Sequence, residues 1–210
     1  MELGEGIAKI LAPGFRSLGF RGAGRHYRRD REYFVDCINV QQVKQNGQVK
    51  FCINLGVVPL FAVPSIEETS RLMEVRCWFR KRLSPSRRDY WINSTNAQAA
   101  DYEAVFKTFG RYGLDFFAAF EFLEDIYGKI SPRNIDARRE KLNAFCSTSQ
   151  PHEFRLEAAR AAVALGDIER AKALATFAAF STANATWAER ERSAEAQRLL
   201  ADILLHSKGG

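Results

Sequence analysis

Two strand-like runs in the sequence carry the same tripeptide and are joined by a tight-turn signal. Cys37-Ile38-Asn39 and Cys52-Ile53-Asn54 stand on either side of the dipeptide Asn46-Gly47. A two-residue hairpin turn of type I′ needs positive φ at both central residues, and Asn-Gly is the pair that adopts it most readily. If these two residues form the loop, Asn39 lies directly opposite Asn54. The sequence therefore predicts an antiparallel hairpin together with its register.

This register divides the hairpin into two faces, because successive side chains of a strand point to opposite sides. One face is apolar and is expected to be core; it carries Ile38, Val40, Phe51, Ile53 and Leu55. The other face carries Cys37 and Cys52 with the candidate binding residues Asn39, Gln41 and Asn54. Amides in mid-strand fit β propensity poorly. Three interpretations stay open: a solvated face, amides hydrogen-bonded beneath a loop, or a binding face.

The spacing of cysteines and histidines predicts neither a metal site nor a cofactor. The four cysteines form no CxxC pair, and the three histidines lie far apart in the sequence. The register also keeps Cys37 and Cys52 too far apart for a disulfide, so reduced cysteines are expected. No motif for a catalytic nucleophile or acid–base pair occurs, so no catalytic residue is assigned and the prediction leans away from an enzyme. A pair of catalytic carboxylates that come together only in the folded chain has no signal in the sequence.

Positive charge is concentrated in the first half of the chain. Residues 1–95 hold 16 Lys or Arg against 9 Asp or Glu, a net charge of +7, whereas residues 96–210 hold 15 against 16, a net charge of −1. Such an asymmetry favours an anionic partner, either a nucleic acid or an acidic protein surface. Solubility alone is the alternative explanation.

The basic residues fall into two clusters interleaved with aromatic residues. The first is Arg21, Arg25, Arg28, Arg29 and Arg31 with His26 and Tyr27; the second is Arg76, Arg80, Lys81, Arg82, Arg87 and Arg88 with Trp78, Tyr90 and Trp91. Arginine binds phosphate in a bidentate manner, and exposed aromatic rings stack on bases. The same composition is typical of protein-binding hot spots and of sheet edges protected by charge. The further candidate binding residues are Arg25, Arg28, Arg76, Trp78, Arg80 and Arg82.

The order of the predicted elements indicates an α+β fold, an antiparallel sheet with covering helices followed by an all-helical extension. Residues 1–95 are predicted to hold an N-terminal helix over 3–18, which Pro13 interrupts, and the sheet. Its strands are expected at 25–29, 33–43, 49–58 and 75–79, with a glycine-rich turn at 19–24 and a helix start at 65–68.

From residue 97 onward the periodicity is helical only. Residues 96–130 are predicted to form helices that pack on the sheet, over 97–112 and 114–127. Residues 131–210 form the helical extension, with one hairpin of the tetratricopeptide kind that turns at Gly166. A stable tetratricopeptide array needs about three repeats, so this hairpin is expected to cap the first domain or to form an interface.

The sequence carries no sign of a membrane or export segment. It has no apolar run long enough to cross a bilayer, and its first residues lack the basic stretch of a signal peptide. We therefore expect a cytoplasmic protein without a membrane partner.

Several motifs in the first half of the chain resemble a bacterial family known as domain of unknown function 4304. They are Leu18-Gly19-Phe20, the strands 34–41 and 51–57, the segment 77–82 and Tyr90-Trp91, where the family tends to have two tryptophans. The resemblance covers roughly the first 95 to 130 residues. It implies an α+β fold with the same polar strand face, and it brings neither an activity nor catalytic residues.

These observations favour a non-enzymatic cytosolic binding module whose partner is another protein, as for an immunity or regulatory protein. A nucleic-acid binder that uses the arginine clusters is the second hypothesis, and it predicts steep salt dependence. An enzyme acting on a small anionic ligand near Asn39, Asn54 and Arg76 is the third. The oligomeric state is not predicted.

Overall fold

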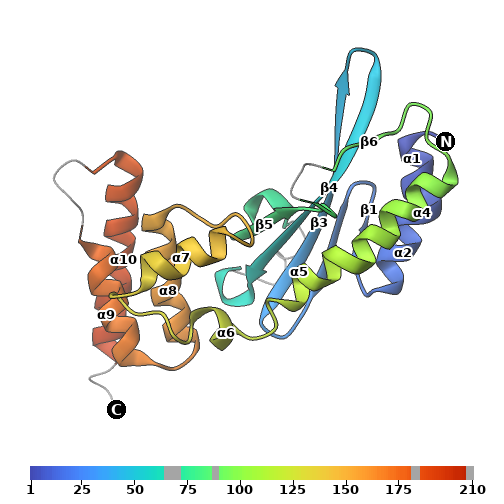
Figure 1. Cartoon of the computed structure of the whole chain (residues 1–210). Coiled ribbons are helices and arrows are strands. Elements are labelled where there is room, and N and C mark those ends of the chain that lie inside the picture. The colour runs from blue at the N-terminus through green and yellow to red at the C-terminus, as the bar shows by residue number, and fades with distance from the viewer. Residues whose placement is uncertain (64–71, 87–89, 181–184, 207–210) are drawn as a thin grey trace. The chain divides into compact units, whose positions relative to one another are not determined.

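The computed structural model describes residues 1–63, 72–86, 90–180 and 185–206. The chain divides into two compact units, Met1–Glu121 and Phe122–Gly210, which are described separately below. The first unit contains an antiparallel sheet and its covering helices, and the second is helical (Figure 1). The predicted α+β class is therefore confirmed.

The sheet of the first unit has six strands, all paired antiparallel. They are β1 (Arg21–Ala23), β2 (His26–Asp30), β3 (Phe34–Gln45), β4 (Gln48–Pro59), β5 (Phe79–Arg82) and β6 (Ile92–Asn93). Strands β1 to β5 follow one another across the sheet in sequence order, and β6 pairs with β4. The long β3–β4 hairpin is the centre of the sheet and supplies most of its buried residues.

The predicted hairpin register is confirmed over the whole length of β3 and β4. Asn39 lies opposite Asn54, and every other pair follows from the same turn. Asn46 and Gly47 have φ of 51° and 74°, the left-handed values that a type I′ turn requires. Local turn chemistry therefore determines the register here.

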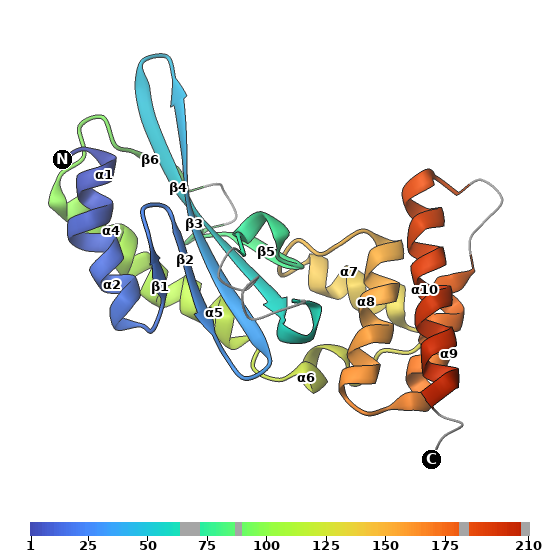
Figure 2. The same ribbon diagram turned by 180° about the vertical axis from the view of Figure 1, so that it is seen from behind.

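Within the described residues, the short 3₁₀ turn η3 (Glu74–Arg76) packs on one face of the sheet, and the α- and π-helices of the first unit cover the other face. These helices are α1 (Leu3–Gly6), η1 (Ile7–Leu11), α2 (Ala12–Ser17), α4 (Ala99–Thr108), η4 (Phe109–Gly113) and α5 (Leu114–Ala118). Figures 1 and 2 show them along the side of the sheet that we call the helical face. Ile38, Val40, Phe51, Ile53 and Leu55 point to this face and are at most 1% exposed, as predicted for core. The other side, which carries Asn39, Gln41, Cys52 and Asn54, is called the amide face.

Aromatic side chains join the helices to the helical face. Phe51 of β4 stacks on Tyr102 of α4 with ring centroids 5.5 Å apart, and Phe15 of α2 lies 5.0 Å from Tyr27 of β2. Gly6 and Gly14 lie in the N-terminal helical stretch that runs from α1 to α2, and they let it approach α4 closely. A Cβ atom would come within 2.3 Å of Tyr102 at the first position and within 2.5 Å of Phe106 at the second.

Pro13 does not end the first helical stretch, which continues to Ser17. Proline lacks the N–H that would bond to the carbonyl of residue 9. The stretch accommodates it with the π-helical turn η1 directly before it, where the N–H of Ala12 donates to the oxygen of Ile7. The glycine-rich turn also differs from expectation, because β1 forms inside it.

Two further predicted elements are shorter or broken in the structure. The strand expected at 75–79 is a 3₁₀ turn, η3 (Glu74–Arg76), and β5 starts only at Phe79. Val75 is 59% exposed, so the apolar alternation there did not reflect a buried strand face. The helix expected at 114–127 ends at Ala118, and α6 (Leu123–Tyr127) follows in the second unit. A short 3₁₀ turn, η2 (Leu60–Ala62), follows β4, and the helix start expected at 65–68 lies outside the described residues.

The second unit continues with α7 (Ile135–Asn143), α8 (Pro151–Ala164), α9 (Ile168–Ala179) and α10 (Trp187–His206). The predicted turn between α8 and α9 forms at Gly166, whose φ is 73°. The Asp167 side chain caps α9 by accepting from the N–H of Arg170 at 3.1 Å. Ala159, Ala161 and Ala171 are fully buried in this unit. No described helix is both long and apolar enough to cross a membrane.

Candidate functional site

A row of four polar residues crosses the amide face. His26 of β2 pairs with Asn39 of β3, Asn39 pairs with Asn54 of β4, and Asn54 pairs with Arg82 of β5. Paired residues of adjacent strands point to the same face of a sheet. These four side chains, which we call the polar row, therefore line up across four strands of a continuous sheet.

Hydrogen bonds join the polar row in two separate groups. The Nδ2 of Asn39 lies 3.2 Å from Nδ1 of His26. The Nδ2 of Asn54 donates to Oε1 of Gln41 at 2.9 Å, and Nε of Arg82 donates to Oδ1 of Asn54 at 3.3 Å. The two amides of the row are half-buried, and their orientation is held by neighbours on the sheet.

Cys52 and Trp91 extend the polar row on the β4 side. The thiol of Cys52 lies 3.8 Å from Oε1 of Gln41 and 3.8 Å from Oδ1 of Asn54. The guanidinium of Arg82 lies over the ring of Trp91, with Cζ 5.0 Å from the ring centroid. A cation at this distance is attracted to the ring face, so Trp91 positions Arg82 beside the amides.

The next row across the sheet brings two more of the predicted arginines onto the amide face. Arg28 pairs with Cys37, which pairs with Gly56, which pairs with Arg80. Arg28 lies 3.7 Å from Asp30, and Arg80 donates to the buried carboxylate of Glu74 at 2.7 Å. These acidic neighbours partly neutralise the second row.

Apolar residues cover one end of the amide face, and Trp78 belongs to them. Val35, Cys37, Val58 and Cys77 form a buried cluster, against which Trp78 packs. The hydrogen bond between the two thiols and the burial of the site raise the pKa of Cys77 well above its usual value. Gly56 is needed here, because a Cβ atom on it would lie 2.7 Å from the sulfur of Cys77. Trp78 is therefore half-buried and packs against this cluster.

Arg25 and Arg76 lie outside the polar row. Arg25 stands at the turn between β1 and β2, and its guanidinium donates to the side chain of Gln42, which faces the helical side of β3. Arg76 is exposed on η3, before β5 begins. The structure thus gathers Asn39, Gln41, Asn54 and Arg82, with Arg28 and Arg80 one row away.

Two arginines of the first cluster serve the core instead of a surface. Arg29 and Arg31 each donate to the fully buried carboxylate of Asp36, at 2.8 and 2.7 Å. Burial raises the pKa of Asp36 and the two guanidiniums oppose that rise. Arg29 also lies 4.6 Å from the ring centroid of Phe20. Strand alternation therefore divides this cluster between two faces.

His26, Cys52 and Trp91 belong to the site, although they were not among its predicted residues. The β3–β4 register identifies Cys52 as a neighbour of Asn54, and only its small apolar character left it out. His26 joins the row only when the β2–β3 register is known, and the loop at residues 31–33 has no motif that fixes its length. Trp91 was named with the second basic cluster, but no sequence pattern predicted that it would lie against Arg82.

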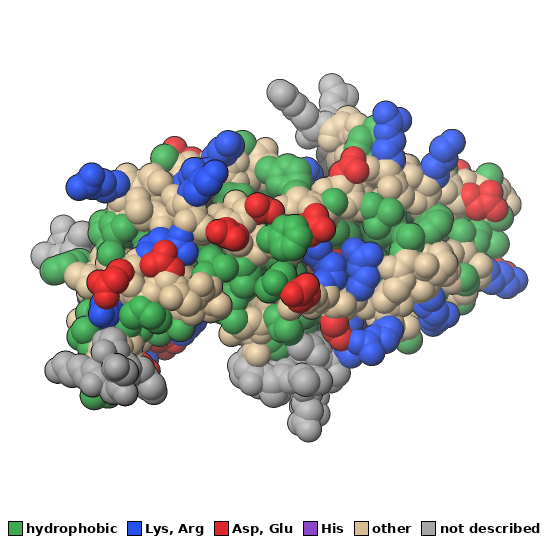
Figure 3. Space-filling model, turned by 90° about the horizontal axis from the view of Figure 1, so that it is seen from below, with side chains coloured by type: hydrophobic (Ala, Val, Ile, Leu, Met, Phe, Trp, Pro, Cys, Tyr) green, Lys and Arg blue, Asp and Glu red, His purple; other side chains and the backbone are tan. Residues whose placement is uncertain are grey.

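Charges of both signs alternate on the face drawn in Figure 3. On the face drawn in Figure 3, Lys and Arg side chains lie beside Asp and Glu side chains, and the described residues form no continuous basic surface there. Among the residues with described positions, no group of three or more His, Cys, Asp or Glu could hold a metal ion.

Comparison with known proteins identifies a family and nothing more specific. Residues 11–116, about half of the chain, match the family model described as Domain of unknown function (DUF4304). No curated protein and no solved structure matches the chain. The matched range contains the polar row and its neighbours.

Proposed function

The chain belongs to the family described as Domain of unknown function (DUF4304), and from this premise we propose that it is a cytosolic binding module without catalytic activity of its own. Its binding surface is the amide face, and its partner is the acidic surface of another protein, as for an immunity or regulatory protein. The observation that carries this proposal is the polar row, which places amide, imidazole and guanidinium groups in register across four strands.

The rigidity of the polar row favours recognition. Each side chain stands on a paired strand, and Asn54 is held by both Gln41 and Arg82. A side-chain amide has two donor hydrogens and an acceptor oxygen with two lone pairs, so these contacts leave hydrogen-bonding capacity for a partner. Groups that are already oriented lose little conformational entropy on binding.

The charge of the amide face favours an acidic partner. Arg21, Arg28, Lys50, Arg80 and Arg82 point to this face by strand alternation, and the described acidic residues beside them are Asp30 and Glu74. Among the described residues of this face, basic side chains therefore outnumber acidic ones. Complementary charge accelerates association and excludes like-charged partners.

The other two hypotheses receive less support from the geometry. Single-stranded nucleic acid is bound on exposed aromatic platforms, but Trp78 packs in the apolar cluster and Arg82 lies over the ring of Trp91. An enzyme site at Asn39, Asn54 and Arg76 requires these three side chains to converge on one substrate. Arg76 lies on η3, outside the polar row.

Site-specific crosslinking in the native host tests the proposal. A photo-reactive residue is placed at position 43, which flanks the polar row on the amide face, and as a control at the exposed position 107 of α4. We expect a defined protein adduct from position 43 that disappears in the Arg82→Gln and Asn54→Ala variants. Equal adducts from both positions, or adducts that survive both substitutions, would reject the amide face as the binding surface.

Titration with a fluorescent 20-nucleotide single strand, at low and at physiological salt, distinguishes the nucleic-acid hypothesis from the protein-binding proposal. The proposal predicts weak binding that Arg82→Gln does not change. Tight binding at low salt that falls steeply with salt and depends on Arg82 would support a nucleic-acid partner instead.

A further inference from the structure

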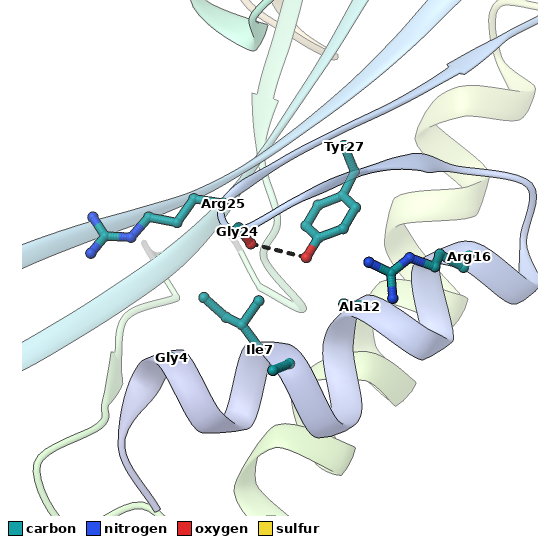
Figure 4. Close-up of a pocket in the computed structure, with 8 residues that line it drawn as sticks. Gly4, Ile7, Ala12, Arg16, Gly24, Arg25 and Tyr27 are labelled. Carbon is teal, nitrogen blue, oxygen red and sulfur yellow. Dashed lines mark hydrogen bonds between the residues drawn. The ribbon is translucent and has the colours of Figure 1, made fainter.

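A pocket of about 260 Å³ lies between the first helical stretch and the β1–β2 hairpin (Figure 4). Its helix side is formed by small residues spaced one turn apart, Gly4, Ala8 and Ala12, so that no large side chain fills the space. Its strand side is formed by Tyr27, which alternates with His26 and so points away from the amide face. The pocket is therefore separate from the polar row.

The walls of the pocket are mostly apolar. Ile7 and Ala12 are 4% and 3% exposed, and in Figure 4 the Ile7 side chain points into the space between the helix and the hairpin. The ring of Tyr27 faces the helix from the opposite side, with its hydroxyl donating to the oxygen of Gly24 at 2.9 Å. Burial raises the pKa of Tyr27, so this hydroxyl stays neutral and adds no negative charge.

Two arginines place positive charge at the two ends of the pocket. Arg16 donates to the oxygen of Gly22 at 3.3 Å, and Arg25 donates to the Gln42 side chain. Within the described part of the chain neither forms an ion pair, in contrast to Arg29 and Arg31, which both bind Asp36. A guanidinium has five N–H donors in a fork that matches a carboxylate, so Arg16 retains donors for a ligand.

The two guanidiniums differ in direction. In Figure 4 the guanidinium of Arg16 lies over Ala12 and next to the hydroxyl of Tyr27, whereas Arg25 extends away from Tyr27. Arg16 is therefore placed to contact a ligand inside the pocket, and Arg25 contributes its charge at the rim. The volume lies just below the roughly 300–1,000 Å³ of pockets for drug-sized ligands, which indicates a compact molecule.

We propose that this pocket binds a small organic carboxylate, with the carboxylate on Arg16 and a compact apolar body against Ile7, Ala12 and the ring of Tyr27. The proposal is independent of the amide face, because Tyr27 and His26 point to opposite sides of β2.

An NMR titration of the full chain with benzoate and its neutral isostere benzamide tests the proposal. Benzoate should shift the amide signals of Ile7, Ala8, Ala12 and Tyr27, and benzamide should bind at least about tenfold more weakly, because it lacks the charge that Arg16 recognises. Equal affinity for the two probes, or no saturable shift at these residues with benzoate, overturns the proposal.

Two variants and a matched control locate the binding. Arg16→Gln removes the charge at an exposed position, and Ala8→Leu fills the pocket from an exposed helix position, so both should fold. Each should weaken benzoate binding by about tenfold or more. Lys9→Gln removes the same charge from the neighbouring helix surface, where Lys9 pairs with Glu5, and should leave the affinity unchanged. An equal loss in Lys9→Gln, or full binding in Arg16→Gln, overturns the assignment to Arg16.

Discussion

Asn39 lies directly opposite Asn54 in the β3–β4 pairing, yet the two amides belong to separate hydrogen-bonded groups. Asn39 bonds toward β2, to His26, whereas Asn54 bonds to Gln41 and Arg82. The polar row is thus held in two halves, and substitutions can weaken one half while the other stays intact.

Asn54→Ala should destabilise the protein more than Asn39→Ala. The first substitution removes the hydrogen bonds with Gln41 and with the charged Arg82 in a half-buried position, and should lower the free energy of unfolding by about 1–3 kcal/mol. The second removes one contact with the exposed His26 and should cost about 0.5–1 kcal/mol. Urea unfolding of both variants measures the difference, and an equal or reversed order would contradict the two-half arrangement.

Gly56→Ala should destabilise the amide face at its apolar end. The added Cβ would lie 2.7 and 2.8 Å from the Sγ and Cβ of Cys77, so the cluster must move, at a cost of about 1–3 kcal/mol. Gly110→Ala is the matched control, because nothing lies within 4 Å of its Cβ position, and it should be neutral or slightly stabilising. Thermal denaturation compares the two variants. A neutral Gly56→Ala would show that Cys77 does not pack on β4.

Features encoded by neighbouring residues could be predicted from the sequence, whereas features that depend on contacts between distant segments could not. The Asn46-Gly47 turn fixes the hairpin register, and Gly166 fixes the turn between α8 and α9, because each needs a positive φ at that residue. The apolar alternation at Val75, Cys77 and Phe79 wrongly predicted a strand with one buried face. Cys77 and Phe79 are both buried, but on different faces of the sheet. Cys77 packs on Gly56 of the amide face, and Phe79 contacts Phe120 on the helical face.

The candidate site shows the same limit. Asn39, Gln41 and Asn54 were identified because one turn determines all their positions. Arg25 was grouped with Arg28 because they are close in sequence, although Arg25 contacts Gln42 at the edge of the helical face. The pocket beside Arg16 had no signal at all, because it depends on small residues of a helix meeting a hairpin whose first strand, β1, lies where only a turn was predicted.

The cysteines should react slowly with a thiol reagent in the folded protein. All four are buried, and the raised pKa of Cys77 further lowers its thiolate fraction at neutral pH. With Ellman's reagent at pH 8 we expect all four thiols to react rapidly in guanidinium chloride and to react at least about a hundredfold more slowly without it. A fast phase in the native protein would show that a cysteine is accessible.

The stability of the second unit should fall as pH rises from about 4.5 to about 8. Burial raises the pKa of Glu157 to about 8, with the hydroxyl of Ser149 donating to its carboxylate at 2.7 Å and opposing that rise. Between pH 4.5, the ordinary pKa of a glutamate side chain, and pH 8 the folded state keeps a proton that the unfolded state releases. The stability present below pH 4.5 is therefore lost as pH rises, with a slope of up to about 1.4 kcal/mol per pH unit. Glu157→Gln should remove this slope and should be more stable than the wild type at pH 8. Urea unfolding at pH 5, 6, 7 and 8 measures both proteins, and parallel pH profiles would show that Glu157 is not buried as a neutral acid.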